Sequence, residues 1–327
     1  MKVLFIGGTG NISTEVSKLC IEKGIDLYLL NRGNKKLSLT EGKEIIADIN
    51  NQAECYKVLI DHKWDVVVNW IAFTKKDVLN DISLFENKTK QYIFISSASA
   101  YEKPPSNPFI TESTPLINPY WQYSRDKIGC EELLNKTFSE NNFPVTIVRP
   151  SLTYDTVIPL PIGGWKDYTI IARMKKGQKV IVHGDGTALW TIMHAKDFAK
   201  GFVGLLGNRQ AIGESFHITS DEVLSWNQIY ESTANAVGKS ANIIHIPTDF
   251  ISKYDSHLQK SLLGDKAHSV IFDNSKIKRY VPDFKATIPY AEGIKKTIDW
   301  FEVKQERQII KQETNDLIDK IISDYEK

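Results

Sequence analysis

The sequence has little cysteine: three residues in 327, at positions 20, 55 and 130. Their odd number and scattered spacing disfavour a disulfide framework or a zinc site, and a cytoplasmic location is predicted. Neither sign of charge is in excess, with 41 Lys and Arg against 40 Asp and Glu, which disfavours a protein built mainly to bind nucleic acid. No apolar run approaches the roughly 18 residues that suggest a membrane span, and no N-terminal signal is expected.

β-rich and helical runs alternate through the first half of the chain. The β-rich runs are KVLFIG, DLYLL, KEIIAD, DVVVNW, QYIFIS and PVTIVRP. Helical candidates between them cover residues 14–23, 51–62 and 120–140. Continuous apolar strands separated by helices are typical of a parallel sheet that is covered on both faces. The predicted fold class is therefore α/β, a doubly wound parallel sheet (Rossmann) with a smaller C-terminal α+β lobe.

The domain boundaries follow from where this alternation weakens. We predict a dinucleotide-binding domain over residues 1–155, continued by about 180–225. Residues 156–179 and 226–300 are predicted to form a substrate-binding lobe that closes over the ends of the strands. Residues 301–327 are predicted to form a charged amphipathic helix, in which Ile310, Leu317 and Ile321 lie close to helical spacing. Packing of this helix on its own domain is favoured, and a contact in a homodimer is the alternative.

The segment GGTGNIS, residues 7–13, joins the first strand to a helical run. Free backbone N–H groups and the helix dipole at such a turn create a phosphate-binding site. Ser13 stands where a dinucleotide fingerprint usually has its third glycine, but it is small enough for the helix to approach the strand. The alternative is an ordinary tight turn.

Tyr123 and Lys127 are spaced as Tyr-x-x-x-Lys and lie one turn apart on one helix face. Asn118 and Pro119 predict the helix start, as N-cap and first turn. A nearby ammonium lowers the pKa of a tyrosine from about 10, so Tyr123 is a candidate general acid and base for a carbonyl or alcohol. The alternative is a surface helix on which Lys127 pairs with Glu131.

The segment SSASAY, residues 96–101, follows the QYIFIS strand and places hydroxyls where substrate binds in such a sheet. Ser97 is predicted to hydrogen-bond the reacting oxygen and to hold it near Tyr123. Local bonding between serine and backbone in a turn is the alternative.

Together these motifs resemble the extended short-chain dehydrogenases/reductases, of the NAD-dependent epimerase/dehydratase type, over about residues 1–300. The resemblance implies a catalytic set of Ser97, Tyr123 and Lys127. It also implies cofactor contacts from the glycine turn, from the ends of the strands and from the Arg-Pro pair after the sixth strand. The implied cofactor-binding residues are Gly7, Thr9, Gly10, Asn11, Ile12, Asn31, Arg32, Asp48, Ile49, Ile71, Ala72, Tyr123, Lys127 and Pro150.

Departures from the family pattern bear on cofactor and substrate. Asn31 replaces an acidic residue of NAD-preferring members and Arg32 follows it, so NADP(H) is favoured over NAD(H), because an arginine pairs with a 2′-phosphate. Alternatively, Arg32 stacks on adenine or faces solvent. Ala98 and Ser99 replace the Asp-Glu of the 4,6-dehydratases, which disfavours dehydration. Trp190 replaces a diphosphate-binding arginine, so the substrate either lacks a diphosphate or stacks on an aromatic surface. Ser99 and Trp190 are the predicted substrate contacts.

The function that these features predict is an NAD(P)-dependent oxidoreductase acting on a small, sugar-like substrate. A nucleotide-sugar epimerase with retained NAD is the alternative within the family. Two alternatives belong to other classes: an RNA-associated protein, since the layout resembles chloroplast stem-loop RNA-binding proteins, and a sensor that binds NADP(H) without turnover. The charge balance disfavours the first and the catalytic set disfavours the second. His183 and His194 lack paired spacing, so no metal site is predicted.

Overall fold

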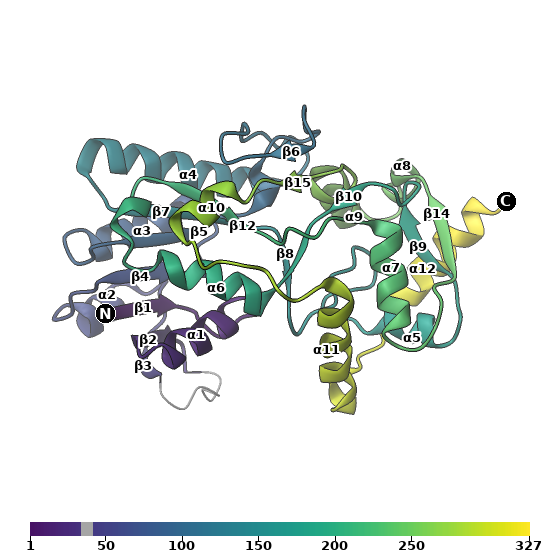
Figure 1. The fold of residues 1–327 in the computed structure, drawn as a ribbon, viewed down its shortest axis with the longest axis horizontal. Coiled ribbons are helices and arrows are strands. Elements are labelled where there is room, and N and C mark those ends of the chain that lie inside the picture. Colours follow the sequence, from purple (N-terminus) through teal and green to yellow (C-terminus); the bar gives the residue numbers. More distant parts are fainter. Residues whose placement is uncertain (34–41) are drawn as a thin grey trace.

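A seven-stranded parallel sheet forms the centre of the N-terminal part of the computed structural model (Figure 1). The structure describes residues 1–33 and 42–327. The strand order is β12-β7-β5-β4-β1-β2-β3, and all neighbours are parallel. The strands are β1 (Lys2–Ile6), β2 (Asp26–Asn31), β3 (Lys43–Ile46), β4 (Val66–Asn69), β5 (Tyr92–Ile95), β7 (Val145–Pro150) and β12 (Ser215–Ile218). The predicted α/β class with a doubly wound parallel sheet is confirmed.

Helices cover both faces of the sheet because successive strand residues point to opposite sides. Val3 and Phe5 of β1 belong to the core on one face, and Leu4 and Ile6 belong to the core on the other. The first face carries α1 (Ser13–Glu22), α6 (Ala195–Leu205) and α10 (Ser275–Tyr280); the second carries α2 (Gln52–Leu59), α3 (Lys75–Phe85) and α4 (Gln122–Asn141). All three cysteines are buried in these layers as free thiols. No helix of the described segments is both long and apolar enough to cross a membrane.

The order in which strands are added to the sheet reverses at β1. β2 and β3 extend the sheet on one side of β1, whereas β4, β5, β7 and β12 extend it on the other. Ile6 at the end of β1 pairs with Asn69 at the end of β4. In open α/β sheets the crevice at such a switch point is where ligands bind.

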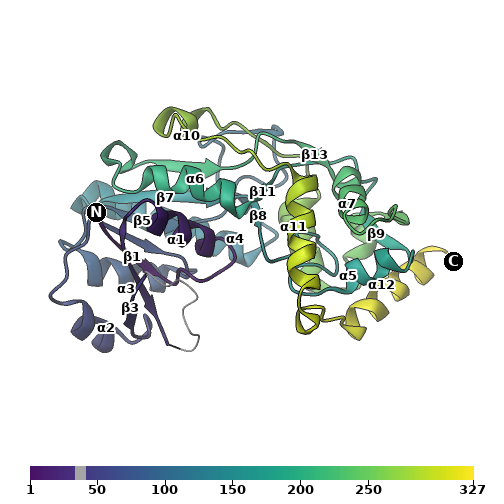
Figure 2. The ribbon, with the colours of Figure 1, turned by 60° about the horizontal axis from the view of Figure 1, so that its bottom comes forward.

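The second part of the chain forms a lobe next to the sheet, and α11 lies between the two parts in the view of Figure 2. Its main strands, β9 (Val180–His183) and β14 (Ile243–Ile246), form a parallel pair. Its helices are α5 (Thr169–Lys175), α7 (Trp226–Asn235), α8 (Thr248–Ile251), α9 (Ser256–Ser261), α11 (Tyr290–Glu302) and α12 (Gln312–Tyr325). Three short pairs join the parts: β6 (Phe109–Ile110) with β15 (Ile271–Phe272), β8 (Leu152–Tyr154) with β11 (Ile192–His194), and β10 (Leu189–Trp190) with β13 (Leu224–Ser225).

Two segments belong to a different part of the molecule than the sequence predicts. β9, within the predicted continuation of the dinucleotide-binding domain, pairs with β14 of the lobe. α10, within the predicted lobe, places Ile277 in the core beneath the sheet, beside Phe198 and Phe202 of α6. Each segment is short and its partner is distant along the chain, so no local pattern reports the pairing.

The C-terminal helix is shorter than the predicted span of residues 301–327. It is α12, and a linker separates it from α11. Ile310 lies in that linker and is 49% exposed, whereas Ile318, Ile321 and Ile322 are buried. These three pack in one cluster with residues of β9 and β14, so the helix packs on the lobe of its own chain.

Candidate functional site

The carboxyl edge of the sheet borders a cavity of about 640 Å³ at the switch point, a size typical of cofactor and substrate sites. The glycine turn after β1 forms one end, the start of α4 and the loops after β4, β5 and β7 form the sides, and the lobe forms the opposite wall. A smaller cavity of about 360 Å³ lies at the ends of β2 and β3 and shares Gly7 and Ile71 with the first. A long ligand can therefore pass from one cavity to the other across the glycine turn.

The glycine turn has a backbone that only glycine fits well. Gly7 and Gly8 have φ angles of 94° and 100°, which L side chains rarely adopt. A Cβ on Gly8 would lie 2.7 Å from the Leu29 side chain. The Ser13 hydroxyl accepts a hydrogen bond of 2.9 Å from the Gly10 N–H, so the residue that replaces the third glycine stabilises the turn. The bare backbone and the N-terminus of α1 suit a pyrophosphate.

Asn11 connects this turn to the segment around β8. Its amide donates to the carbonyl oxygen of Thr153 at 2.9 Å and its Oδ1 accepts from the Thr156 N–H at 3.3 Å. Asn11, a predicted cofactor contact, thus lies on the cavity wall, and its side chain holds the turn against β8.

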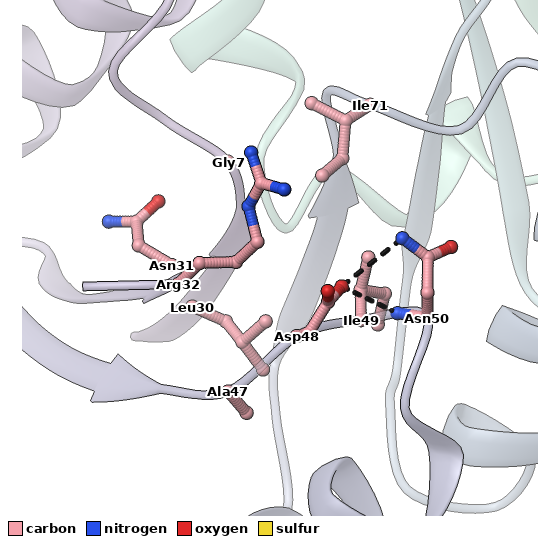
Figure 3. Close-up of a pocket in the computed structure, with 9 residues that line it drawn as sticks. All are labelled: Gly7, Leu30, Asn31, Arg32, Ala47, Asp48, Ile49, Asn50 and Ile71. Carbon is pink, nitrogen blue, oxygen red and sulfur yellow. Dashed lines mark hydrogen bonds between the residues drawn. The ribbon is translucent and has the colours of Figure 1, made fainter. Parts of the chain in front are cut away.

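The smaller cavity brings together the predicted residues at the ends of β2 and β3 (Figure 3). Arg32 is exposed, and its side chain extends from the end of β2 toward Ile71. Asp48 accepts hydrogen bonds of 3.0 and 3.1 Å from the backbone and side-chain N–H groups of Asn50. One guanidinium and one carboxylate therefore line the place where the adenosine half of a dinucleotide would lie.

Lys127 is almost fully buried on α4, and its amine points at backbone carbonyls rather than at a carboxylate. Nζ donates to the carbonyl oxygens of Ala72 at 2.6 Å and Ile95 at 2.7 Å, which leaves one of its three N–H donors for the cavity. Burial lowers the pKa of Lys127 to about 8. The alternative pairing with Glu131 does not occur, because Glu131 binds Arg149.

Ala72 is one of the predicted cofactor contacts. Its side chain is 1% exposed in the core and does not reach the cavity wall. Only its carbonyl serves the site, by binding Lys127. The neighbours Trp70, Ile71 and Phe73 line the cavity instead, since the chain turns after β4 and brings the flanking side chains outward.

Tyr123 lies on the cavity wall with Lys127 Nζ 5.8 Å from its ring centre. Burial raises the pKa of the Tyr123 phenol, and the neighbouring Ser97 hydroxyl opposes that rise. The predicted lowering of this pKa by Lys127 is therefore wrong, because desolvation of the buried phenol is the largest influence on it. Ser97 Oγ lies 2.9 Å from Ser99 Oγ, which also accepts from Ser124 Oγ at 2.9 Å. The hydroxyls of the SSASAY segment thus form a short chain beside the phenol.

Asn118 is not the N-cap that the sequence suggests. α4 begins at Gln122, and its N-cap position makes no side-chain bond. The Asn118 amide donates to the carbonyl oxygens of Ser99 at 2.8 Å and Gly264 at 2.6 Å, and its Oδ1 accepts from the Tyr120 and Trp121 N–H groups. Asn118 thereby fastens the chain before α4 to both the sheet and the lobe.

A buried ion pair lies behind the SSASAY segment, and the sequence does not reveal it. Arg149 donates to Glu131 through Nη2 at 2.6 Å and Nε at 3.0 Å, with both side chains at most 5% exposed. Glu131 also accepts from the Ser96 hydroxyl, and Arg149 Nη1 donates to the Tyr101 hydroxyl at 3.1 Å. Arg149 therefore faces away from the cavity, and only Pro150 of the Arg-Pro pair lines it.

Most of the remaining predicted residues line one of the two cavities, and two histidines are buried outside both. Ser99 and Trp190 line the larger cavity although each is at most 3% exposed, and Trp190 stacks on Trp226 with ring centres 5.8 Å apart. Gly7, Thr9, Gly10, Ile12, Asn31 and Ile49 line one or both cavities. His183 and His194 are buried outside both. Within residues 1–33 and 42–327, no cluster of three metal-ligating side chains occurs.

Comparison with known proteins agrees with this geometry. The family model described as "NAD dependent epimerase/dehydratase family" matches residues 3–219. The chain is 23% identical over 286 residues to the 2′-dehydrokanamycin reductase of Streptomyces kanamyceticus, covering 87% of this chain and 80% of that protein. It is 26% identical over 266 residues to the chloroplast stem-loop binding protein of 41 kDa b of Arabidopsis thaliana, covering 76% and 67%. In fold it is similar to the NAD complex of dTDP-glucose 4,6-dehydratase from Bacillus anthracis, with a TM-score of 0.73, 18% identity, and coverage of 94% and 98%.

Proposed function

The chain belongs to the NAD-dependent epimerase/dehydratase family of extended short-chain dehydrogenases/reductases, and within it we propose an NAD(P)-dependent oxidoreductase that acts on a sugar-like substrate. The observation that carries the proposal is that Ser97, Tyr123 and Lys127 line the same cavity as the glycine turn. Its similarity to 2′-dehydrokanamycin reductase supports a reductase that acts on a carbonyl of a sugar derivative.

Each catalytic side chain has a role that its surroundings suit. The nicotinamide, when bound, supplies the hydride for the carbonyl carbon. Tyr123 gives its phenolic proton to the carbonyl oxygen, and Ser97 hydrogen-bonds that oxygen. Lys127 is held by two carbonyls and, with a pKa of about 8, is charged at neutral pH. Its charge favours the phenolate that Tyr123 leaves behind, and the phenolate regains its proton from solvent.

We propose NADP(H) as the preferred cofactor. Arg32 lines the smaller cavity at the end of β2, and Asn31 beside it carries no charge that would repel a 2′-phosphate. A guanidinium can form paired charge-assisted hydrogen bonds with a phosphate.

A Tyr123→Phe variant tests the catalytic assignment. NADPH oxidation would be followed at 340 nm with keto sugars that carry a nucleotide and with keto sugars that do not. We expect turnover to fall by about 10²–10⁴-fold in Tyr123→Phe, because the proton donor is lost, while NADPH binding is retained. Tyr120→Phe is the matched control, since Tyr120 is 37% exposed and does not line the cavity. An unchanged rate in Tyr123→Phe would refute the assignment. Stoichiometric NAD released from the denatured protein would instead favour an epimerase that retains its cofactor.

A further inference from the structure

The part of the cavity beyond Tyr123 is walled by aromatic rings that come from separate segments of the chain. Trp121 precedes α4 and lies 5.1 Å from the Tyr123 ring. Trp165 comes from the loop after β8, Trp190 from β10 and Phe272 from β15. Aromatic side chains thus line the same cavity as Tyr123, the residue proposed to give the proton.

The lobe side of this wall has no net charge. Among the described residues, the charged side chains that line the cavity are Lys127, Asp265 and Lys266. Lys127 lies at the catalytic end, and Asp265 pairs with Lys266 at 3.0 Å. Lys103 interacts with Asp265 from outside the wall, and burial lowers its pKa. Among the described cations, a diphosphate on this side would meet only the Lys266 ammonium, whose charge Asp265 already neutralises. No arginine of the described segments lines this part of the cavity to form paired hydrogen bonds with a phosphate.

Trp165 is held in an unfavourable backbone conformation at this wall. Its φ is +62°, a value that bulky L residues rarely adopt and that tends to occur at functional sites. Two backbone hydrogen bonds with Ile158, of 2.8 and 2.6 Å, fix the loop in this conformation. A Cβ on Gly164 would lie 2.8 Å from the Ile158 carbonyl oxygen, so glycine is needed before Trp165. The indole nevertheless remains 48% exposed, although it lines the cavity.

We propose that Trp165 is a specificity-determining residue and that the substrate is a glycoside without a diphosphate, whose ring stacks on this indole. The proposal rests on the proposed function and names its substrate class. A sugar ring has an apolar C–H face and a polar edge of hydroxyls. The C–H groups suit the electron-rich face of an indole, and the hydroxyls can bond to the Asp265 carboxylate and the Lys266 ammonium.

Saturation-transfer NMR on the NADP⁺-loaded protein tests this proposal. The probes are maltose and kanamycin A, which are glycosides without phosphate, and UDP-glucose. We expect signals from the sugar C–H protons of at least one phosphate-free glycoside, and weaker binding of UDP-glucose. Trp165→Ala should weaken glycoside binding by about tenfold, the effect expected for the loss of one aromatic contact. Trp300→Ala is the control, because Trp300 is 36% exposed and lies outside the cavity.

Three outcomes would overturn the proposal: tighter binding of UDP-glucose than of either glycoside, no signal from either glycoside, or unchanged glycoside affinity in Trp165→Ala. NADPH titration of the same samples separates this proposal from the function on which it rests. If the wild-type protein does not bind NADPH or NADH, the oxidoreductase function itself fails. If NADPH binds equally well to wild type and Trp165→Ala, any loss of glycoside binding belongs to Trp165.

Discussion

Arg32 is the single residue on which the proposed choice of cofactor depends. Its guanidinium lines the smaller cavity beside Asn31 and Asp48. Arg32→Ala should weaken NADPH binding by about 10–100-fold, because hydrogen bonds to charged groups contribute roughly 1.5–3 kcal/mol. NADH, which lacks the 2′-phosphate, should lose much less. Titration of both reduced cofactors by their fluorescence measures the ratio of the two affinities.

Arg209→Ala is a matched control for this measurement, because Arg209 is exposed on the short helix Arg209–Ala211 and lines neither cavity. Equal affinities of the wild-type protein for NADPH and NADH would contradict the preference. An unchanged ratio in Arg32→Ala would contradict the role of this residue.

At the scale of single residues, the sequence predicts positions on the cavity wall where chemistry and spacing coincide. Tyr123 and Lys127 share a helix face, and Ser97 follows a strand, so local periodicity places all three at the site. Ala72 contacts the site residue Lys127 through its backbone carbonyl and not through its side chain, and a residue type does not predict a backbone contact. The Arg149–Glu131 pair joins β7 to α4, and no local pattern reports a contact between two elements.

At the scale of elements, α12 supports the loop that carries Trp165. Ile318 is fully buried and belongs to the same cluster as Ile162, which lies in that loop. The Thr314 hydroxyl also donates to the Asp167 carboxylate at 2.6 Å, just after Trp165. The C-terminal helix therefore stabilises the loop that forms one wall of the larger cavity.

Ile318→Ala should lower the free energy of unfolding by about 2–5 kcal/mol, because it leaves a cavity in a closely packed cluster. NADPH affinity should remain, since the glycine turn and Arg32 belong to the sheet part. Ile310→Ala, at an exposed position in the preceding linker, should change stability by less than about 0.5 kcal/mol. Urea unfolding of the three proteins measures the difference, and equal stability of both variants would show that α12 does not support the lobe.

Element predictions succeeded where a local signal is strong. The six predicted strands of the sheet are short runs rich in β-branched and other apolar residues, and each is present. α3 was not predicted, although the sequence does carry its signal: Thr74 and Asp77 form a reciprocal capping box at its start. The short pair of β9 and β14 has no comparable signal, because its partners are distant along the chain.

At the scale of the whole molecule, buried histidines are spread over both parts and the region between them. His183 ends β9 in the lobe, His194 ends β11, and His217 lies in β12 of the sheet. Burial lowers the pKa of each of these histidines to about 4. Asp81 has the opposite effect on proton binding, since burial raises the pKa of its carboxyl to about 7.

These pKa shifts make the free energy of unfolding depend on pH. An unfolded histidine has a pKa of about 6.5, so between pH 6.5 and 4 the unfolded chain binds a proton at each of the three sites that the folded protein does not. Over the same range Asp81 in the folded state holds one proton that the unfolded chain lacks, because an unfolded aspartate has a pKa of about 3.9. The unfolded state therefore binds about two more protons, and the stability must fall as the pH falls. Burial also lowers the pKa of His62 and His268, which adds to the difference, and raises the pKa of Asp155 and Glu112, which reduces it at the acid end.

We expect the free energy of unfolding to decrease by about 2.7 kcal/mol per pH unit below pH 6.5, the value for two protons. Urea unfolding at several pH values between 4.5 and 7 measures this slope. His194→Asn is the matched variant, because His194 Nδ1 caps α6 by accepting from the Lys196 N–H, and asparagine is also a good N-cap. The variant should keep the helix start and lose about 1.4 kcal/mol per pH unit of the slope, which corresponds to one proton. A slope equal to that of the wild-type protein would mean that His194 is not held neutral in the folded state.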